Sequence, residues 1–153
     1  MLRIHNIHLS HTRLILPARQ YVPPTGQQWT SLVSESTLQV NEFNTDPHDS
    51  RIHYITTKPI QPSSTRMPAG LSDSTTTRKQ LGIGERAILL QTDAGNVLWD
   101  LVAWIDDATV DFVKEKGGLK AIVVSHPHFY TTHLEWARVF GCPIYLCEAD
   151  KEW

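Results

Sequence analysis

The chain has 153 residues, of which 41% are hydrophobic and 20% charged, and its formal net charge at pH 7 is −2. This length and composition predict a globular protein with one sizeable hydrophobic core. The near-neutral charge offers no basic surface of the kind that binds nucleic acid or anionic membranes, and no apolar run approaches the length of a membrane span.

Residues 1–80 differ in composition from the rest of the chain. Most of the nine prolines fall there, together with long Ser/Thr tracts and few sustained apolar patterns. Such a segment buries too little apolar surface to offset the entropy of ordering, so it is predicted to be an irregular N-terminal region or linker. One short strand is predicted within it, at residues 51–57, where β-branched and aromatic residues are frequent.

Residues 81–153 carry regular signals and are predicted to form the folded domain. The predicted elements are a hairpin of strands 86–92 and 96–100 around Asp93-Ala94-Gly95, a helix capped by Asp106 and ended by Gly117-Gly118, a buried strand at 119–125, a helix at 132–140 stopped by Gly141, and a strand at 143–147. Gly supplies the positive φ of a tight turn and ends helices, whereas Asp caps helix N-termini. The order strand–strand–helix–strand–helix–strand predicts an α/β layer with a mixed sheet.

The chain contains two cysteines, Cys142 and Cys147. Both fall on or beside the last predicted strand, where the geometry disfavours a disulfide between them. We therefore expect two buried free thiols, which fit a reducing compartment. The N-terminus lacks an apolar core of signal-peptide length, so the predicted location is the cytoplasm.

Three histidines follow the buried strand at 119–125. His126 and His128 are one residue apart, and His133 comes at the start of the next helix. Side chains on a strand alternate between its two faces, so His126 and His128 are expected to face the same side and to converge on one ion. Three neutral imidazoles would leave one position of a zinc ion open for chemistry. The alternatives are that the first two histidines only bond loop carbonyls and that His133 only caps its helix.

This motif resembles the metallo-β-lactamase superfamily, whose hallmark is His-x-His-x-Asp-His after a β-strand. His126 and His128 match the first two histidines of that motif. Tyr130 stands where the family has its aspartate, Thr131 stands at the next histidine, and His133 lies two positions beyond the motif. The flanking hairpin that ends in Asp100 and the helix after it are also similar to the family pattern.

The resemblance covers about residues 82–153 and implies an α/β fold. The family fold is an αββα sandwich, and this chain resembles its first half only, preceded by the irregular region. The implied activity is metal-dependent hydrolysis of an ester, thioester or lactam bond in a small-molecule substrate. A hydroxide on one zinc ion would be the nucleophile, and His126, His128 and His133 are the candidate ligands. The chain stops before the family's later ligands, which implies a truncated product or a fragment.

The resemblance also implies roles for two further residues. The family aspartate that matches Asp100 supports the metal site through hydrogen bonds that orient the ligands. In the alternative interpretation, Asp100 only forms a structural turn. Tyr130 is expected either to donate a hydrogen bond to an oxyanion or to pack as a plug over the second metal position.

A rival interpretation makes the chain a catalytically inactive pseudoenzyme or an interaction module. Half of a two-layer sandwich would leave one face of its sheet uncovered. An exposed apolar face of that size favours association, so self-association through this face is expected.

Overall fold

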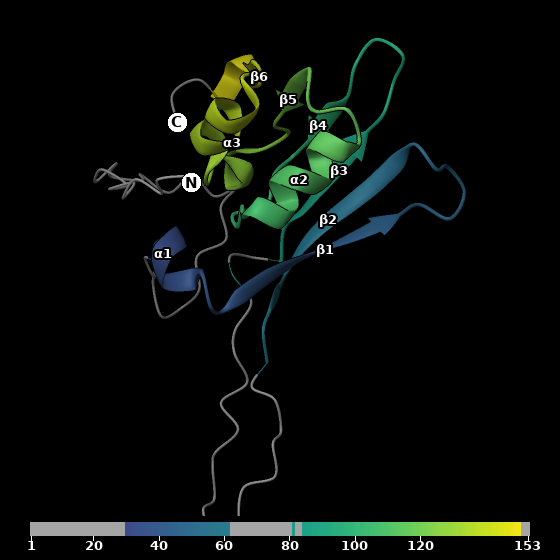
Figure 1. Ribbon diagram of the computed structural model, residues 1–153. Helices are drawn as coiled ribbons and strands as arrows, with labels where there is room; N and C mark the ends of the chain where they lie inside the picture. The colour runs from purple at the N-terminus through teal and green to yellow at the C-terminus, as the bar shows by residue number, and fades with distance from the viewer. Residues whose placement is uncertain (1–29, 62–80, 82–83, 151–153) are drawn as a thin grey trace, which may run out of the picture.

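The computed structural model describes residues 30–61, 81 and 84–150, which form a mixed α/β fold around a six-stranded sheet of order β1-β2-β3-β4-β5-β6 (Figure 1). The pairs β1–β2, β2–β3 and β3–β4 are antiparallel, whereas the pairs β4–β5 and β5–β6 are parallel. The elements are α1 (Leu32–Glu35), β1 (Gln39–Thr45), β2 (Ile52–Pro59), β3 (Arg86–Leu90), β4 (Val97–Trp99), α2 (Asp107–Glu115), β5 (Ala121–Val123), α3 (His133–Phe140) and β6 (Ile144–Tyr145).

The first two strands come from the region that sequence analysis treats as irregular. β2 contains the strand predicted at residues 51–57, but β1 is unexpected, and both belong to the same sheet as the strands after residue 84. The physical reason is that β1 buries the polar residues Gln39 and Asn41 rather than apolar ones, so the usual alternating signal is missing. Residues 1–29 and 62–80, also predicted to be irregular, lie outside the described residues.

Buried hydrogen bonds attach β1 to the helix layer. The side-chain amide of Asn41 donates to Trp104 O at 2.9 Å and to Thr109 Oγ1 at 2.8 Å, while Asn41 Oδ1 accepts from Thr57 Oγ1 at 2.7 Å. Thr109 lies in the first turn of α2 and is fully buried. Asn41 can therefore face the core because its side-chain donors and acceptor are satisfied there, whereas the buried Gln39 Oε1 has no hydrogen-bond partner among the described residues.

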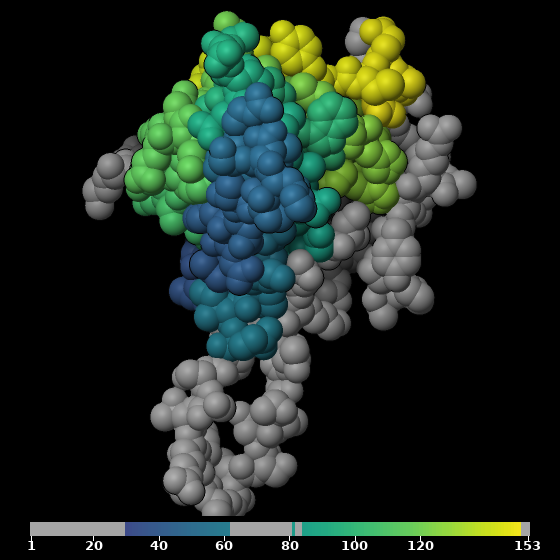
Figure 2. All heavy atoms as spheres, turned by 90° about the vertical axis from the view of Figure 1, so that its right-hand side faces the viewer, coloured from purple at the N-terminus to yellow at the C-terminus, as the bar shows by residue number. Residues whose placement is uncertain are grey.

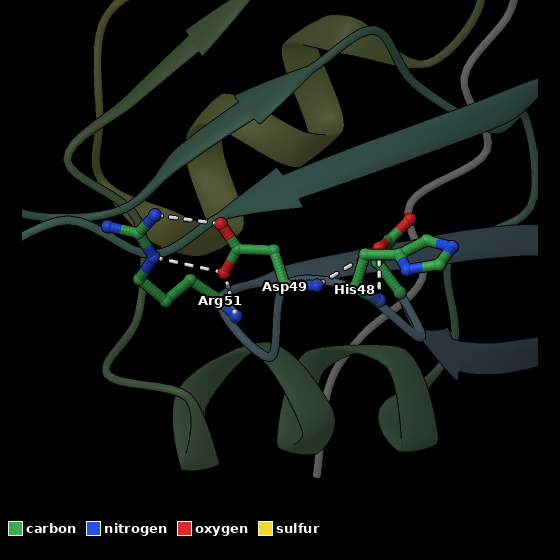
Figure 3. A network of polar contacts seen from close by, with 4 residues as sticks. His48, Asp49 and Arg51 are labelled. Carbon is green, nitrogen blue, oxygen red and sulfur yellow. Dashed lines mark hydrogen bonds and ion pairs between the residues drawn. The ribbon is translucent and has the colours of Figure 1, made fainter.

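Two aspartates shape the turn between β1 and β2 (Figure 3). Asp46 Oδ1 accepts the backbone N–H groups of His48 and Asp49, at 2.8 and 3.1 Å. Asp49 in turn accepts the backbone N–H of Arg51 and pairs with its guanidinium at 2.7 Å. The Arg51 side chain is 72% exposed, so the ion pair itself adds little stability, and the turn is fixed mainly by the backbone bonds.

The predicted elements after residue 84 are present in the predicted order. Gly95 in the β3–β4 turn has φ 113°, and a Cβ there would lie 2.9 Å from Lys120 Cβ, which explains the need for glycine. Asp106 caps α2 by accepting the N–H and the hydroxyl of Thr109. Gly141 ends α3 at φ 62°. β5 and β6 are shorter than the predicted strands.

The hydrophobic core lies between one face of the sheet and the helices α2 and α3. Leu89, Leu98 and Ile122 are neighbours across β3, β4 and β5, and all three are fully buried. They belong to one cluster with Val113 of α2 and Trp136 of α3. Figure 1 shows α2 crossing in front of the strands, and Figure 2, which looks toward β1, shows the green of α2 on one side of the blue hairpin.

The opposite face of the sheet is less covered. Its central row contains Ile88, Trp99, Val123 and Tyr145, which are paired across neighbouring strands. Trp99 is 41% exposed and Tyr145 is 59% exposed. The described residues thus leave an apolar row on one side of the sheet. None of the helices among them is both long and apolar enough to cross a bilayer.

Substituting Trp136→Ala should destabilise the fold by about 3–5 kcal/mol, because it removes the largest fully buried side chain of the core. Urea unfolding followed by circular dichroism measures this change. The matched control is Leu134→Ala on the same helix, where the side chain is 71% exposed and the loss should stay within about 0.5 kcal/mol. Equal losses in the two variants would contradict the assignment of the core to this face.

Candidate functional site

His126 and His128 lie in the loop that leaves the end of β5. Their ring centroids are 4.5 Å apart and the rings are tilted by 41°. The expected cause, alternation along a strand, is wrong, because β5 ends at Val123 and Pro127–Phe129 form a single 3₁₀ turn. His126 is extended just before this turn, and the turn brings the His128 ring beside it.

The surroundings of His128 favour its neutral form. Burial lowers its pKa below the ordinary value, and the nearby His126 lowers it further. A neutral imidazole is the form that binds metal ions, since a protonated ring has no lone pair to donate. At neutral pH the loop therefore presents His128 in the form that a metal site requires.

Asp100 anchors the start of this loop. Its buried carboxylate accepts the Ser125 backbone N–H at 2.7 Å and the Ser125 hydroxyl at 2.8 Å. Its own N–H donates to Val123 O at 2.8 Å, and its φ is 59°, a left-handed conformation that Asp tolerates better than most residues. Because Ser125 directly precedes His126, Asp100 fixes where the histidine loop begins. Asp100 thus forms a structural turn, one of its two predicted roles, and its support of a metal site stays a prediction.

The segment after Asp100 makes further bonds to the same region. Val102 O accepts Trp136 Nε1–H at 3.2 Å, and Ala103 O accepts the Thr132 hydroxyl at 3.0 Å. Residues 100–103, which we call the floor segment, therefore hold both ends of the chain from Ser125 to Trp136. Trp136 and Thr132 belong to the start of α3 and its preceding turn.

Glu85 also forms a hydrogen bond with the floor segment. The sequence did not predict this residue as part of the site. It directly precedes β3, and its Oε2 accepts the Ala103 N–H at 3.1 Å. Burial raises its pKa from 4.5 to about 7, opposed only by this hydrogen bond. No sequence signal marks it, because a Glu before a strand is normally solvated, and its partner is 18 positions away.

His133 does not join the histidine pair. It is the first residue of α3, and its ring Nδ1 forms a very short hydrogen bond with Tyr130 O. A carbonyl only accepts, so Nδ1 carries the proton. Within the part of the chain that the structure describes, no three His, Cys, Asp or Glu side chains are grouped to hold a metal ion. The predicted three-histidine set is therefore not assembled there.

Tyr130 packs against the hydrophobic core, and its hydroxyl donates to Asp150 O at 3.3 Å. Burial raises its pKa above the ordinary value, and the charges of Asp150 and Cys147 raise it further. The side chain links the histidine loop to the 3₁₀ turn Glu148–Asp150. This hydrogen bond occupies the hydroxyl that would have to stabilise an oxyanion.

The cysteine prediction is correct for Cys142, which is free and buried, and wrong for the burial of Cys147, which is free but exposed. The reason is that β6 ends at Tyr145, so Cys147 lies beyond the covered strand. A hollow of about 520 Å³ opens elsewhere, between the β1–β2 turn, the β3–β4 turn and Lys116. It contains none of the predicted site residues.

No family model matches the chain. The chain is similar to the uncharacterized protein YmaE of Bacillus subtilis (strain 168), with 36% identity over 135 residues. The match covers 88% of this chain but only 42% of YmaE, so the chain spans less than half the length of this relative.

Substituting Asp100→Ala should destabilise the chain by about 2–4 kcal/mol, because it removes two hydrogen bonds and places alanine at positive φ. Asp100→Asn should lose about 1 kcal/mol or less, since Asn tolerates this backbone conformation and its amide oxygen can still accept the Ser125 N–H. Urea unfolding at pH 7 compares the two variants. A loss within about 0.5 kcal/mol for Asp100→Ala, the range of a neutral surface substitution, would contradict the role assigned to this side chain.

Glu85 should make the fold less stable as pH rises. Its folded pKa lies above its unfolded one, so the folded state binds more protons between about 4.5 and 7, and stability falls through this window. Glu85→Gln abolishes the titration. The variant should gain roughly 2–3 kcal/mol relative to the wild type between pH 5 and pH 8, measured by urea unfolding at both pH values. A constant difference would refute the raised pKa.

Proposed function

We propose that the chain is a divergent member of the metallo-β-lactamase superfamily and supplies the first part of a metal-dependent hydrolase. The observation that carries the proposal is the pair of imidazole rings, 4.5 Å apart, in the loop after a parallel strand. Support comes from the Asp100 carboxylate, which holds the residue before this pair. The sheet, with its helices packed on one face, also suits one layer of an αββα sandwich.

The described residues fit part of a zinc site. Zinc accepts imidazole nitrogen readily, and His126 and His128 would supply two such ligands. A catalytic zinc ion usually has three protein ligands. His133 donates Nδ1–H to Tyr130 O, which leaves Nε2 able to bind, but among the described residues its ring is not grouped with the other two. We propose that the remaining ligands come from polypeptide outside the described residues, as the greater length of YmaE allows.

The residues of this chain would then orient the metal ligands. Zinc, when bound, supplies a hydroxide near neutral pH and polarises a carbonyl of an ester, thioester or lactam. Burial keeps His128 neutral for binding. Asp100 holds the loop through its two bonds to Ser125, so the role we assign it is positioning. Because Tyr130 is bound to Asp150 O, we assign it no catalytic role.

A second candidate is a non-catalytic interaction module. The apolar row that includes Trp99 and Tyr145 favours it, because large exposed apolar patches mark association surfaces. Within the hydrolase proposal, the same row would face the second layer of the sandwich. Without that layer, it would drive self-association of the chain. Two free thiols fit a cytoplasmic location in either case.

The purified chain should bind one zinc or cobalt ion through His126 and His128, with an affinity well below that of a complete site. Titration calorimetry, or the absorption of bound cobalt, measures this binding. His126→Ala and His128→Ala should each weaken it at least tenfold, whereas His133→Ala, the matched control, should change it by less than twofold. Equal metal affinity in all three variants would contradict the metal proposal.

The isolated chain should hydrolyse activated esters, thioesters and lactams poorly, because two ligands leave the ion loosely held and the motif aspartate is absent. The assay compares the zinc-loaded chain with buffer that contains zinc alone. Robust turnover that His126→Ala or a chelator abolishes would mean that this chain suffices as an enzyme, and the partial-site proposal would be wrong.

A further inference from the structure

Glu85 and the candidate histidines lie at the same end of the central strands, although they are distant in the sequence. β3 is antiparallel to β4, with Ile88 opposite Trp99, so the start of β3 lies beside the end of β4. β5 is parallel to β4, so it also ends at this end of the sheet. The Glu85 carboxylate therefore reaches Ala103, the last residue of the floor segment, at this end of the strands.

The backbone N–H and the carbonyl of Ala103 both form hydrogen bonds with side chains. Its N–H donates to Glu85 Oε2 at 3.1 Å, and its carbonyl accepts the Thr132 hydroxyl at 3.0 Å. The neighbouring residue, Val102, is fully buried and accepts the Trp136 indole N–H. A displacement of Ala103 would therefore affect both contacts that hold the start of α3.

The environment of the Glu85 carboxylate disfavours its charged form. In the described part of the chain, burial is the cause that raises its pKa, the Ala103 hydrogen bond is the only opposing one, and no charged side chain contributes. A neutral carboxyl group can keep its half-buried position, because its carbonyl oxygen still accepts the Ala103 N–H. An ionised one is drawn toward water, because no cationic side chain among the described residues compensates its charge.

We propose that Glu85 is a pH-dependent positioning residue for the candidate site. When neutral it stays against Ala103 and keeps the floor segment under the histidine loop. When ionised it moves toward solvent, and the floor segment opens more often, together with the start of α3. The inference does not depend on a bound metal, because it concerns only contacts within the chain.

The test is nuclear magnetic resonance on the metal-free, ¹⁵N-labelled chain between pH 5.5 and pH 8.5. The Ala103 amide shift should titrate with a midpoint near 7. The opening that exposes the Ala103 N–H and the Trp136 indole N–H to hydrogen exchange should increase about tenfold between pH 6 and pH 8, after correction for intrinsic base catalysis. This factor follows from the proton linkage of a group whose pKa is about 7 when buried and 4.5 when solvated.

Glu85→Gln should remove both the Ala103 titration and the tenfold change. The matched control is Glu115→Gln, at the exposed end of α2, which should behave as the wild type. Equal pH dependence of exchange in the wild type and in Glu85→Gln would overturn the proposal. If the variant does not fold, the wild type decides alone, because an Ala103 midpoint near 4.5, or none, would also overturn it.

Discussion

The loop that carries the histidine pair depends on how the chain leaves β4. Asp100 turns the backbone at positive φ, and its carboxylate takes both the N–H and the hydroxyl of Ser125. A buried charged acceptor with two donors is among the stronger hydrogen-bonding arrangements in a protein. Further along the floor segment, the carbonyls of Val102 and Ala103 accept the Trp136 indole N–H and the hydroxyl of Thr132, the residue before α3. The candidate site is therefore built from the ends of strands rather than from a self-contained motif.

The two faces of the sheet differ, and the candidate site lies where the central strands end. One face is closed by α2 and α3 over Leu89, Leu98 and Ile122. The other presents an apolar row that includes Trp99 and Tyr145. A hydrolase that is completed by further polypeptide and a module that binds through this row would both use that asymmetry. They differ in whether the histidine loop gains more ligands.

Sequence analysis predicted the elements after residue 84 well because their signals are local. Asp106 caps α2 through Thr109, three residues away, and Gly95 is required by its own turn. The histidine pair was predicted from residue types, but the 3₁₀ turn that brings the rings together has no clear sequence signature. Glu85 could not be predicted, because its burial depends on a segment that folds back from 18 residues away. β1 could not be predicted either, because its buried Asn41 is satisfied by Trp104 and Thr109, far along the chain.

The polar inner side of β1 determines how this edge strand pairs. Side chains alternate along a strand, so a shift of one residue against β2 would exchange its two faces. Asn41 would then turn to solvent, and the Thr109 hydroxyl and Trp104 carbonyl would lose their buried donor. Glu42, now exposed, would come to lie under α2 as an uncompensated charge. An apolar edge strand would tolerate such slippage more easily, so these buried amides give β1 a unique register and a defence against mispairing.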